Sequence, residues 1–197
     1  VNSSQSGVVV GRSMTGANSS VGVGISNSMG QSAVAIGRSN NAARNGVAVG
    51  ISNATTSNSN DVAIGIGNSV GQTGISIGVQ NNSNSQTGIG IGYYNSNNIY
   101  TAVAVGISNT DNRGAVVFGR GNTTNRGYNI NSNRTVVVGL TNTNNGKNNA
   151  QFGTGPMTIF GMDNTQNFSG SIYGDRNTNI NQVTIFGNDN ADIVNGD

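Results

Sequence analysis

One short pattern of apolar and small residues recurs along the chain: an aliphatic residue, a small residue, a second aliphatic residue and then glycine. Val34–Gly37 reads Val-Ala-Ile-Gly, and Val47–Gly50 reads Val-Ala-Val-Gly. Alternation with a period of two residues is typical of a β-strand. Glycine then gives the backbone the freedom to leave the strand and turn. The glycines that close the pattern are Gly11, Gly24, Gly37, Gly50, Gly65, Gly78, Gly92, Gly106, Gly119, Gly139, Gly161, Gly174 and Gly187.

The spacing of these glycines indicates the fold. Most intervals are 13 to 15 residues, and two are 20 and 22 residues. A unit this short has room for two short strands and two turns, which make one coil of a β-solenoid, whereas helical repeats take about 30 residues or more. The predicted fold class is therefore all-β: a parallel β-solenoid, or β-roll, of about 13–14 residues per coil. Coils stacked at about 4.8 Å would build a rod of roughly 60 Å.

A second column of identical residues supports this register. Asparagine follows the glycine by three residues in every repeat except the first, where Met14 takes its place. Asparagine tolerates left-handed backbone and hydrogen-bonds its own turn. We therefore predict a structural ladder in which side-chain amides bond from coil to coil, as in other stacked β-assemblies. Its members are Asn27, Asn40, Asn53, Asn68, Asn81, Asn95, Asn109, Asn122, Asn142, Asn164, Asn177 and Asn190.

Strand alternation also predicts which side chains point inward. The large aliphatic residues, first and third in each pattern, are expected to fill the interior, which leaves the middle residue outside. That middle residue is small and uncharged in most repeats, which suits close packing against another surface. We expect a self-association strip formed by Ala35, Ala48, Ala63, Ser76, Gly90 and Ala104. The alternative is that small residues merely suit a tight coil.

The repeats change along the chain. Residues 1–140 carry the regular pattern, and residues 141–197 carry variant repeats with insertions and aromatic residues expected in the core, within the same continuous domain. Thr158–Gly161, for example, reads Thr-Ile-Phe-Gly. The two long intervals cover residues 120–138 and 140–160. Their polar segments, Gly127–Arg134 and Thr143–Lys147, are expected to be loops.

Composition narrows the possible chemistry. Only 34% of residues are hydrophobic and 8% are charged, with a net charge of +2. Such a chain would be expected to be disordered, except that stacked repeats need only a thin core. His and Cys are absent, so zinc, haem, thiol and Ser-His-Asp chemistry lack their residues. We expect no enzyme activity, cofactor or metal site. Without a basic cluster or a long apolar stretch, neither nucleic acid binding nor a membrane span is expected.

The regular repeats resemble the head domains of trimeric autotransporter adhesins, the YadA-like family. The residues that carry the resemblance are Ala33–Gly37, Gly46–Gly50, Asp61–Gly65 and Ala102–Gly106, and the similarity covers about residues 7–140. It implies a left-handed parallel β-roll, three chains side by side, and attachment to a host matrix or cell surface. The polar, Asn-rich second half of each repeat and the C-terminal Ile-Phe-Gly repeats differ from that family.

The expected function is therefore structural or adhesive: a non-enzymatic extracellular module that self-associates as a trimeric adhesin, fibre or filament. It would lie on a cell or virion surface, with a host surface or glycan as possible ligand. A phage tail-fibre module and an ice-binding β-solenoid are the alternatives, and the second would need regular rows of exposed threonine. Tyr93, Tyr94 and Tyr100 form an aromatic cluster for which we expect local packing, with a sugar or partner contact as the alternative.

Overall fold

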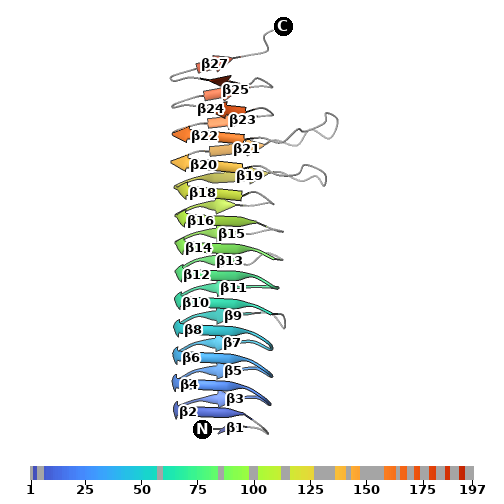
Figure 1. Ribbon diagram of the computed structural model, residues 1–197, viewed down its shortest axis with the longest axis vertical. Helices are drawn as coiled ribbons and strands as arrows, with labels where there is room; N and C mark the ends of the chain where they lie inside the picture. Colours follow the sequence, from blue (N-terminus) through green and yellow to red (C-terminus); the bar gives the residue numbers. More distant parts are fainter. Residues whose placement is uncertain are drawn as a thin grey trace.

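The computed structural model spans residues 1–197. It describes residues 2–3, 7–56, 60–83, 87–97, 102–111, 116–126, 136–140, 143–146, 158–162, 165–167, 171–173, 178–180, 185–186 and 191–193. Within these ranges the chain forms strands and turns only. The strands stack one above another along a single rod, with the two ends of the chain at opposite ends of it (Figure 1).

Two parallel sheets make up the rod, and the chain alternates between them. The long-strand sheet contains β2 (Val8–Arg12), β4 (Val21–Ile25), β6 (Val34–Arg38), β8 (Val47–Ile51), β10 (Val62–Ile66), β12 (Ile75–Val79), β14 (Ile89–Tyr93), β16 (Val103–Ile107), β18 (Val116–Arg120), β20 (Val136–Leu140), β22 (Thr158–Met162), β24 (Ser171–Tyr173) and β26 (Ile185–Phe186). The short-strand sheet contains β1 (Asn2–Ser3), β3 (Thr15–Gly16), β5 (Ser28–Met29), β7 (Asn41–Ala42), β9 (Ala54–Thr55), β11 (Ser69–Val70), β13 (Asn82–Ser83), β15 (Ser96–Asn97), β17 (Thr110–Asp111), β19 (Thr123–Arg126), β21 (Thr143–Gly146), β23 (Thr165–Asn167), β25 (Thr178–Ile180) and β27 (Ala191–Ile193).

Strand pairing confirms the predicted parallel β-solenoid. Val34 pairs with Val47 and Gly37 with Gly50, so equivalent residues of successive repeats lie side by side. The pairing is parallel throughout both sheets, because each coil returns the chain to its starting edge one strand higher. The left-handed sense implied by the resemblance stays a prediction.

The same turn geometry recurs from repeat to repeat and explains why glycine closes each pattern. The pattern-closing glycine has a positive φ in every described regular repeat, 117° at Gly37 and 119° at Gly50. A β-carbon on Gly37 would also overlap the carbonyl oxygen of Gly50 in the next coil. Backbone conformation and close approach of neighbouring coils therefore both require glycine here. Two residues later the chain is again left-handed, as at Ser39 with φ 56°.

The strand ladder continues beyond the regular repeats. β20 pairs with β22, which places Val138 beside Phe160. Thr143–Lys147 was expected to be a loop, and this was wrong for Thr143–Gly146, which forms β21 and pairs with β19, whereas Lys147 lies outside the described residues. The open edge of the coil below supplies a hydrogen-bonding partner that outweighs the weak strand propensity of Asn and Gly. Residues 127–134 lie outside the described residues, and the division at residue 140 stays a prediction.

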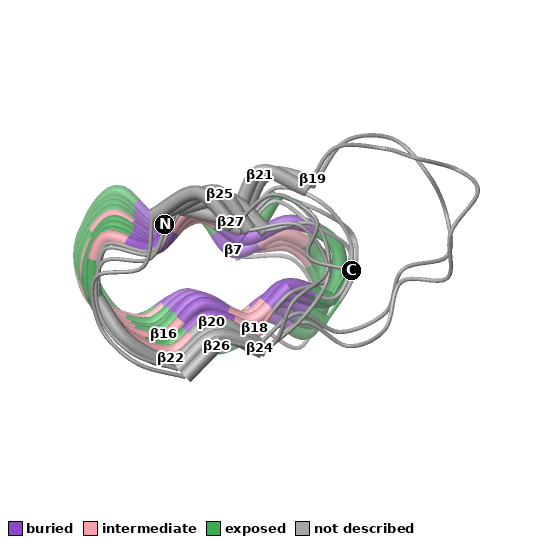
Figure 2. The backbone as a smooth tube through the Cα atoms, turned by 90° about the horizontal axis from the view of Figure 1, so that it is seen from above, coloured by how far each residue is buried: buried purple, intermediate pink, exposed green. Residues whose placement is uncertain are grey.

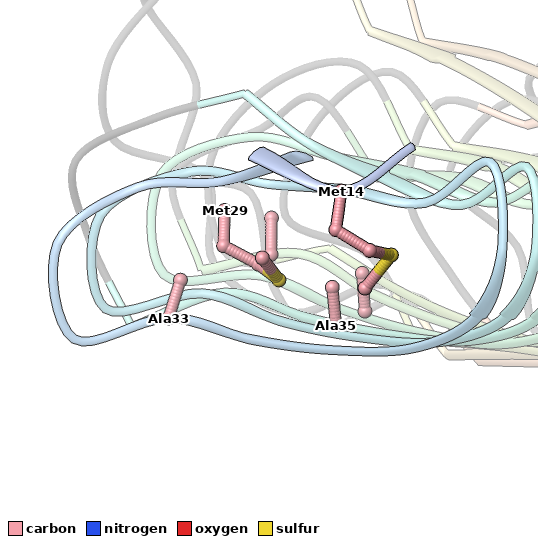
Figure 3. Close-up of a cluster of buried hydrophobic side chains, with 6 residues drawn as sticks. Met14, Met29, Ala33 and Ala35 are labelled. Atoms are coloured by element: carbon pink, nitrogen blue, oxygen red, sulfur yellow. The ribbon is translucent and has the colours of Figure 1, made fainter. Parts of the chain in front are cut away.

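The interior is narrow and filled by small side chains. The two sheets face one another across it, and the buried positions line the inner surface of each (Figure 2). Near the first coils, Met14 and Met29 fill the space beside Ala33 and Ala35 (Figure 3). A β-carbon on Gly22 would overlap the sulfur of Met29. The space between the sheets is therefore limited to less than two large side chains per coil.

This narrow interior reverses the predicted direction of the pattern residues. The middle residues are inside: Ala35, Ala48, Ala63, Ser76, Gly90 and Ala104 are buried, so the predicted self-association strip is wrong. The first and third residues, which were expected inside, point outward, and Ile36 is 40% exposed. Ala, Gly and Ser suit so small a gap at most middle positions, and a single valine, such as Val117, is also accommodated and fully buried.

Candidate interaction face

The predicted asparagine ladder forms one wall of the interior. In Asn68, the amide oxygen Oδ1 accepts hydrogen bonds from the backbone N–H of Asn81 at 3.0 Å and from Asn81 Nδ2 at 3.1 Å. The amide nitrogen Nδ2 donates to the carbonyl oxygens of Ile64 at 2.9 Å and Gly78 at 2.8 Å. Each amide thus ties its own turn to the coils on both sides, which keeps the turns stacked.

The ladder is continuous through the described coils. Backbone N–H groups donate to the preceding Oδ1 at 2.9–3.2 Å from Asn40 to Asn122. The confirmed members are Asn27, Asn40, Asn53, Asn68, Asn81, Asn95, Asn109 and Asn122, all buried. In the first coil the sulfur of Met14 accepts the N–H of Asn27 at 3.4 Å, in place of an amide oxygen. Asn142, Asn164, Asn177 and Asn190 lie outside the described residues.

The outer side of the long-strand sheet is an apolar surface, which we call the aliphatic face. It consists of the first and third pattern residues of the described coils: Val8, Val21, Val34, Val47, Val62, Ile75, Ile89, Val103 and Val116, and Val10, Val23, Ile36, Val49, Ile64, Ile77, Ile91, Val105, Phe118 and Val138. The third residues are the more exposed, with Ile64, Ile77 and Ile91 each at 37% and Phe118 at 42%. The parallel register places these side chains in straight rows along the rod.

One edge of the aliphatic face is more varied. The residue after each pattern glycine also points outward, and we call this row the edge column: Arg12, Ile25, Arg38, Ile51, Ile66, Val79, Tyr93, Ile107, Arg120 and Leu140. Tyr93 and the next residue, Tyr94, are 44% and 47% exposed. Their rings meet edge to face with centroids 4.2 Å apart. A side-chain hydrogen bond with Tyr94 is the main cause that raises the pKa of the Tyr93 phenol above its ordinary value.

The opposite side of the rod is polar. The outward residues of the short-strand sheet include Thr15, Ser28 and Asn41, all exposed, and Ser69 and Ser96, which are half-buried. These positions vary among Thr, Ser, Asn and Ala from coil to coil. The rod therefore has one apolar face and one polar face. The side chains of both faces point outward and take no part in filling the interior.

Charged groups are few in the described coils. Arg12, Arg38, Arg44 and Arg120 are exposed, whereas Asp61 is buried and its Oδ1 accepts the N–H of Gly74 at 3.3 Å. No group of three or more potential metal ligands of the His, Cys, Asp or Glu type occurs in this part of the chain. The same residues contain no helix with the length and apolarity of a membrane span.

Comparisons with known proteins give no relative for this chain. No protein-family model matches it, and neither curated proteins nor solved structures give a significant match. The aliphatic face is thus identified from geometry alone. Its residues were predicted from the sequence to lie inside. The small size of most middle residues could have indicated the correct direction, because an interior position limits the size of a side chain and an exposed position does not.

Proposed function

We propose that this chain is a structural rod that self-associates through the aliphatic face. The observation that carries the proposal is the long, regular array of exposed Val and Ile on one side of the long-strand sheet. Monomeric soluble proteins rarely expose apolar patches beyond about 300–600 Å². The aliphatic face with its edge column, at about 550 Å², lies at the upper end of that range, where such a patch is often functional. A second copy of the same face is complementary to it.

The size of the face supports a partner of this kind. The ten strands from β2 to β20 extend about 43 Å at a spacing of about 4.8 Å. The aliphatic face together with the edge column, which includes Arg12, Arg38 and Arg120, spans about 13 Å across the strands. Two such surfaces together would bury about 1,100 Å², close to the roughly 1,000 Å² expected of a specific interface. The flatness of parallel strands and the branched shape of Val and Ile favour close packing between copies.

The biological setting is part of the same proposal. A polar, Asn-, Ser- and Thr-rich outer side with few charges suits an extracellular fibre or a surface adhesin, as the resemblance to trimeric adhesin heads implies. A closed trimer and an open filament would both use the aliphatic face, and they differ in mass. The polar side would then face solvent and any host surface or glycan. The module needs no catalytic group for this role.

The alternatives place different demands on the outer surfaces. A phage tail-fibre module would associate through the same face and differ only in its setting. An ice-binding solenoid would need aligned threonine on one flat side. The described outward positions hold Val and Ile on one sheet, and a mixture beginning Thr15, Ser28, Asn41 on the other. We therefore favour self-association.

The proposal is tested by placing charge on one face at a time. The double variant Ile64→Arg, Ile77→Arg puts two charges in the middle of the aliphatic face, and Ser28→Arg, Asn41→Arg puts the same charges on the polar side. By sedimentation equilibrium we expect the wild type and the polar-side variant to form the same oligomer, and the aliphatic-face variant to be monomeric. A wild type that is still monomeric at about 100 µM, roughly tenfold above a weak Kd of about 10 µM, would refute the proposal. So would equal association of the two variants.

A further inference from the structure

Self-association on the aliphatic face leaves the register of the two copies open. This inference rests on the proposed function. The rows of Val and Ile repeat at every coil, so a partner that slips by one coil, about 4.8 Å, meets nearly the same surface. Strand assemblies with uniform faces are prone to such slippage. A defined oligomer therefore needs residues that interrupt the repeat.

The strongest interruption is the pair Tyr93–Tyr94. In the equivalent positions the neighbouring coils have Val79–Gln80 and Ile107–Ser108, so the two aromatic rings are unique among the described coils. Both rings are nearly half exposed although they pack on one another. Local packing, the role expected from sequence, thus uses only part of their surface. The remaining ring surface is free to contact another molecule.

The turn that holds Tyr94 has the same backbone in the other coils. The φ of Tyr94 is 56°, in the left-handed region that large side chains rarely adopt. The equivalent residues Ser52, Gln80 and Ser108 have φ of 52–55°. The left-handed turn thus recurs from coil to coil, and the feature particular to this one is a tyrosine ring at that position.

The pair lies within the proposed interface. β14 is the seventh of the ten strands, β2 to β20, that carry the aliphatic face, and Tyr93 stands in its edge column. In a full overlap of two parallel copies, β14 lies level with β14 of the partner. Residues that dominate binding are commonly Tyr, Trp and Arg. Phe118 also interrupts the rows, but it lies two strands away, in β18, and has no positive φ.

From these observations we infer that Tyr93 and Tyr94 anchor the second copy on the aliphatic face and fix its register. In the full-overlap register the two rings lie against the surface beside β14 of the partner. A slip by one coil moves them to a level shaped for Ile107 and Ser108, where the contact is lost. The aliphatic rows supply adhesion, and the tyrosine pair selects one alignment.

The test replaces the anchor with the residues of the neighbouring coil. Tyr93→Ile, Tyr94→Ser reproduces the Ile-Ser pair at 107–108 and suits the left-handed turn, so folding is retained. The matched control, Ile107→Ala, Ser108→Ala, trims the same two positions one coil away. We expect the anchor variant to raise the dissociation constant at least about tenfold and to broaden the mass distribution in sedimentation velocity. The control should change the constant less than about threefold.

The outcomes separate this inference from the proposed function. If the wild type associates and the anchor variant matches it in both affinity and mass distribution, the inference is wrong and the proposed function stands. Equal losses in the two variants would mean that contact area alone matters, which also overturns the anchor. A monomeric wild type overturns both. Wild-type binding to a glycan array that the anchor variant loses, with no change in its mass, would assign the tyrosines to a sugar instead.

Discussion

Replacing Asn68 by alanine removes one rung of the buried ladder and leaves its neighbours without hydrogen-bond partners. The buried N–H of Asn81 loses its acceptor, because it donates to Asn68 Oδ1 at 3.0 Å. The carbonyl oxygens of Ile64 and Gly78 lose the Nδ2 donor at 2.9 Å and 2.8 Å. Asn53 Oδ1 loses the bond from Asn68 Nδ2 at 3.0 Å but keeps the one from the backbone N–H of Asn68. The unpaired groups therefore lie in this turn and in the coil above it.

The magnitude follows from these lost bonds. A buried donor without an acceptor costs about 1–3 kcal/mol, and each hydrogen bond whose remaining partner can be partly resolvated costs about 1 kcal/mol. The N–H of Asn81 belongs to the first class, and the carbonyl groups of Ile64 and Gly78 belong to the second. Asn53 Oδ1 and Asn81 Nδ2 each lose one bond and keep others. We expect Asn68→Ala to lower the free energy of unfolding by about 3–5 kcal/mol.

The assay is urea unfolding at fixed protein concentration, combined with hydrogen exchange of the backbone amides. Asn41→Ala is the matched control, because Asn41 is exposed in β7, and it should change stability by less than about 0.5 kcal/mol. Exchange at Asn81 should accelerate strongly in Asn68→Ala and stay slow in the control. A loss below about 1 kcal/mol, with Asn81 still protected, would refute the view that the ladder holds the coils together.

Gly37→Ala should lower the free energy of unfolding by more than about 3 kcal/mol in thermal melts followed by circular dichroism, because its β-carbon would overlap the carbonyl of Gly50; a loss below about 1 kcal/mol would contradict this. Gly22→Ala and Met29→Ala should each lower the free energy of unfolding. In a double-mutant cycle the double variant should lose about 1–3 kcal/mol less than the sum of the two single losses, because a β-carbon at residue 22 would overlap the Met29 side chain. Additive losses would refute the view that the two side chains compete for the same space. Tyr94→Asn should stabilise the monomer by up to about 1 kcal/mol in urea unfolding, because asparagine adopts the left-handed backbone more readily than tyrosine, and a destabilised variant would count against that strain.

The fold could be predicted from sequence because two of its backbone requirements leave single-residue signatures. Gly50 is needed where positive φ coincides with close contact between coils, and Asn53 is needed where one side chain bonds three coils. Neither demand can be met by a similar residue, so both columns repeat almost without variation. The period, strand pairing and ladder all follow from these two columns.

The direction of the side chains could not be derived in the same way. Strand alternation says that Val34 and Ala35 lie on opposite sides, but not which side is inside. The usual rule, that the larger apolar residue is buried, fails here because the buried asparagines and the two close backbones already occupy the interior. The prediction of a loop at β21 was wrong for a different reason. Strand formation there depends on pairing with β19 below it, which the composition of the segment does not indicate.

Under the proposed function, separate residues serve the fold and the association. The coils are held by backbone pairing, by amides such as Asn68 and by small inner residues such as Ala48, none of which touches solvent. The large outward residues, such as Ile64 and Ile77, add little to that interior, and leaving them exposed has a cost that only a covering surface offsets. Substitutions on the aliphatic face should thus change oligomeric state without unfolding the rod. The reverse holds for the ladder, where a lost amide should unfold coils before it alters the face.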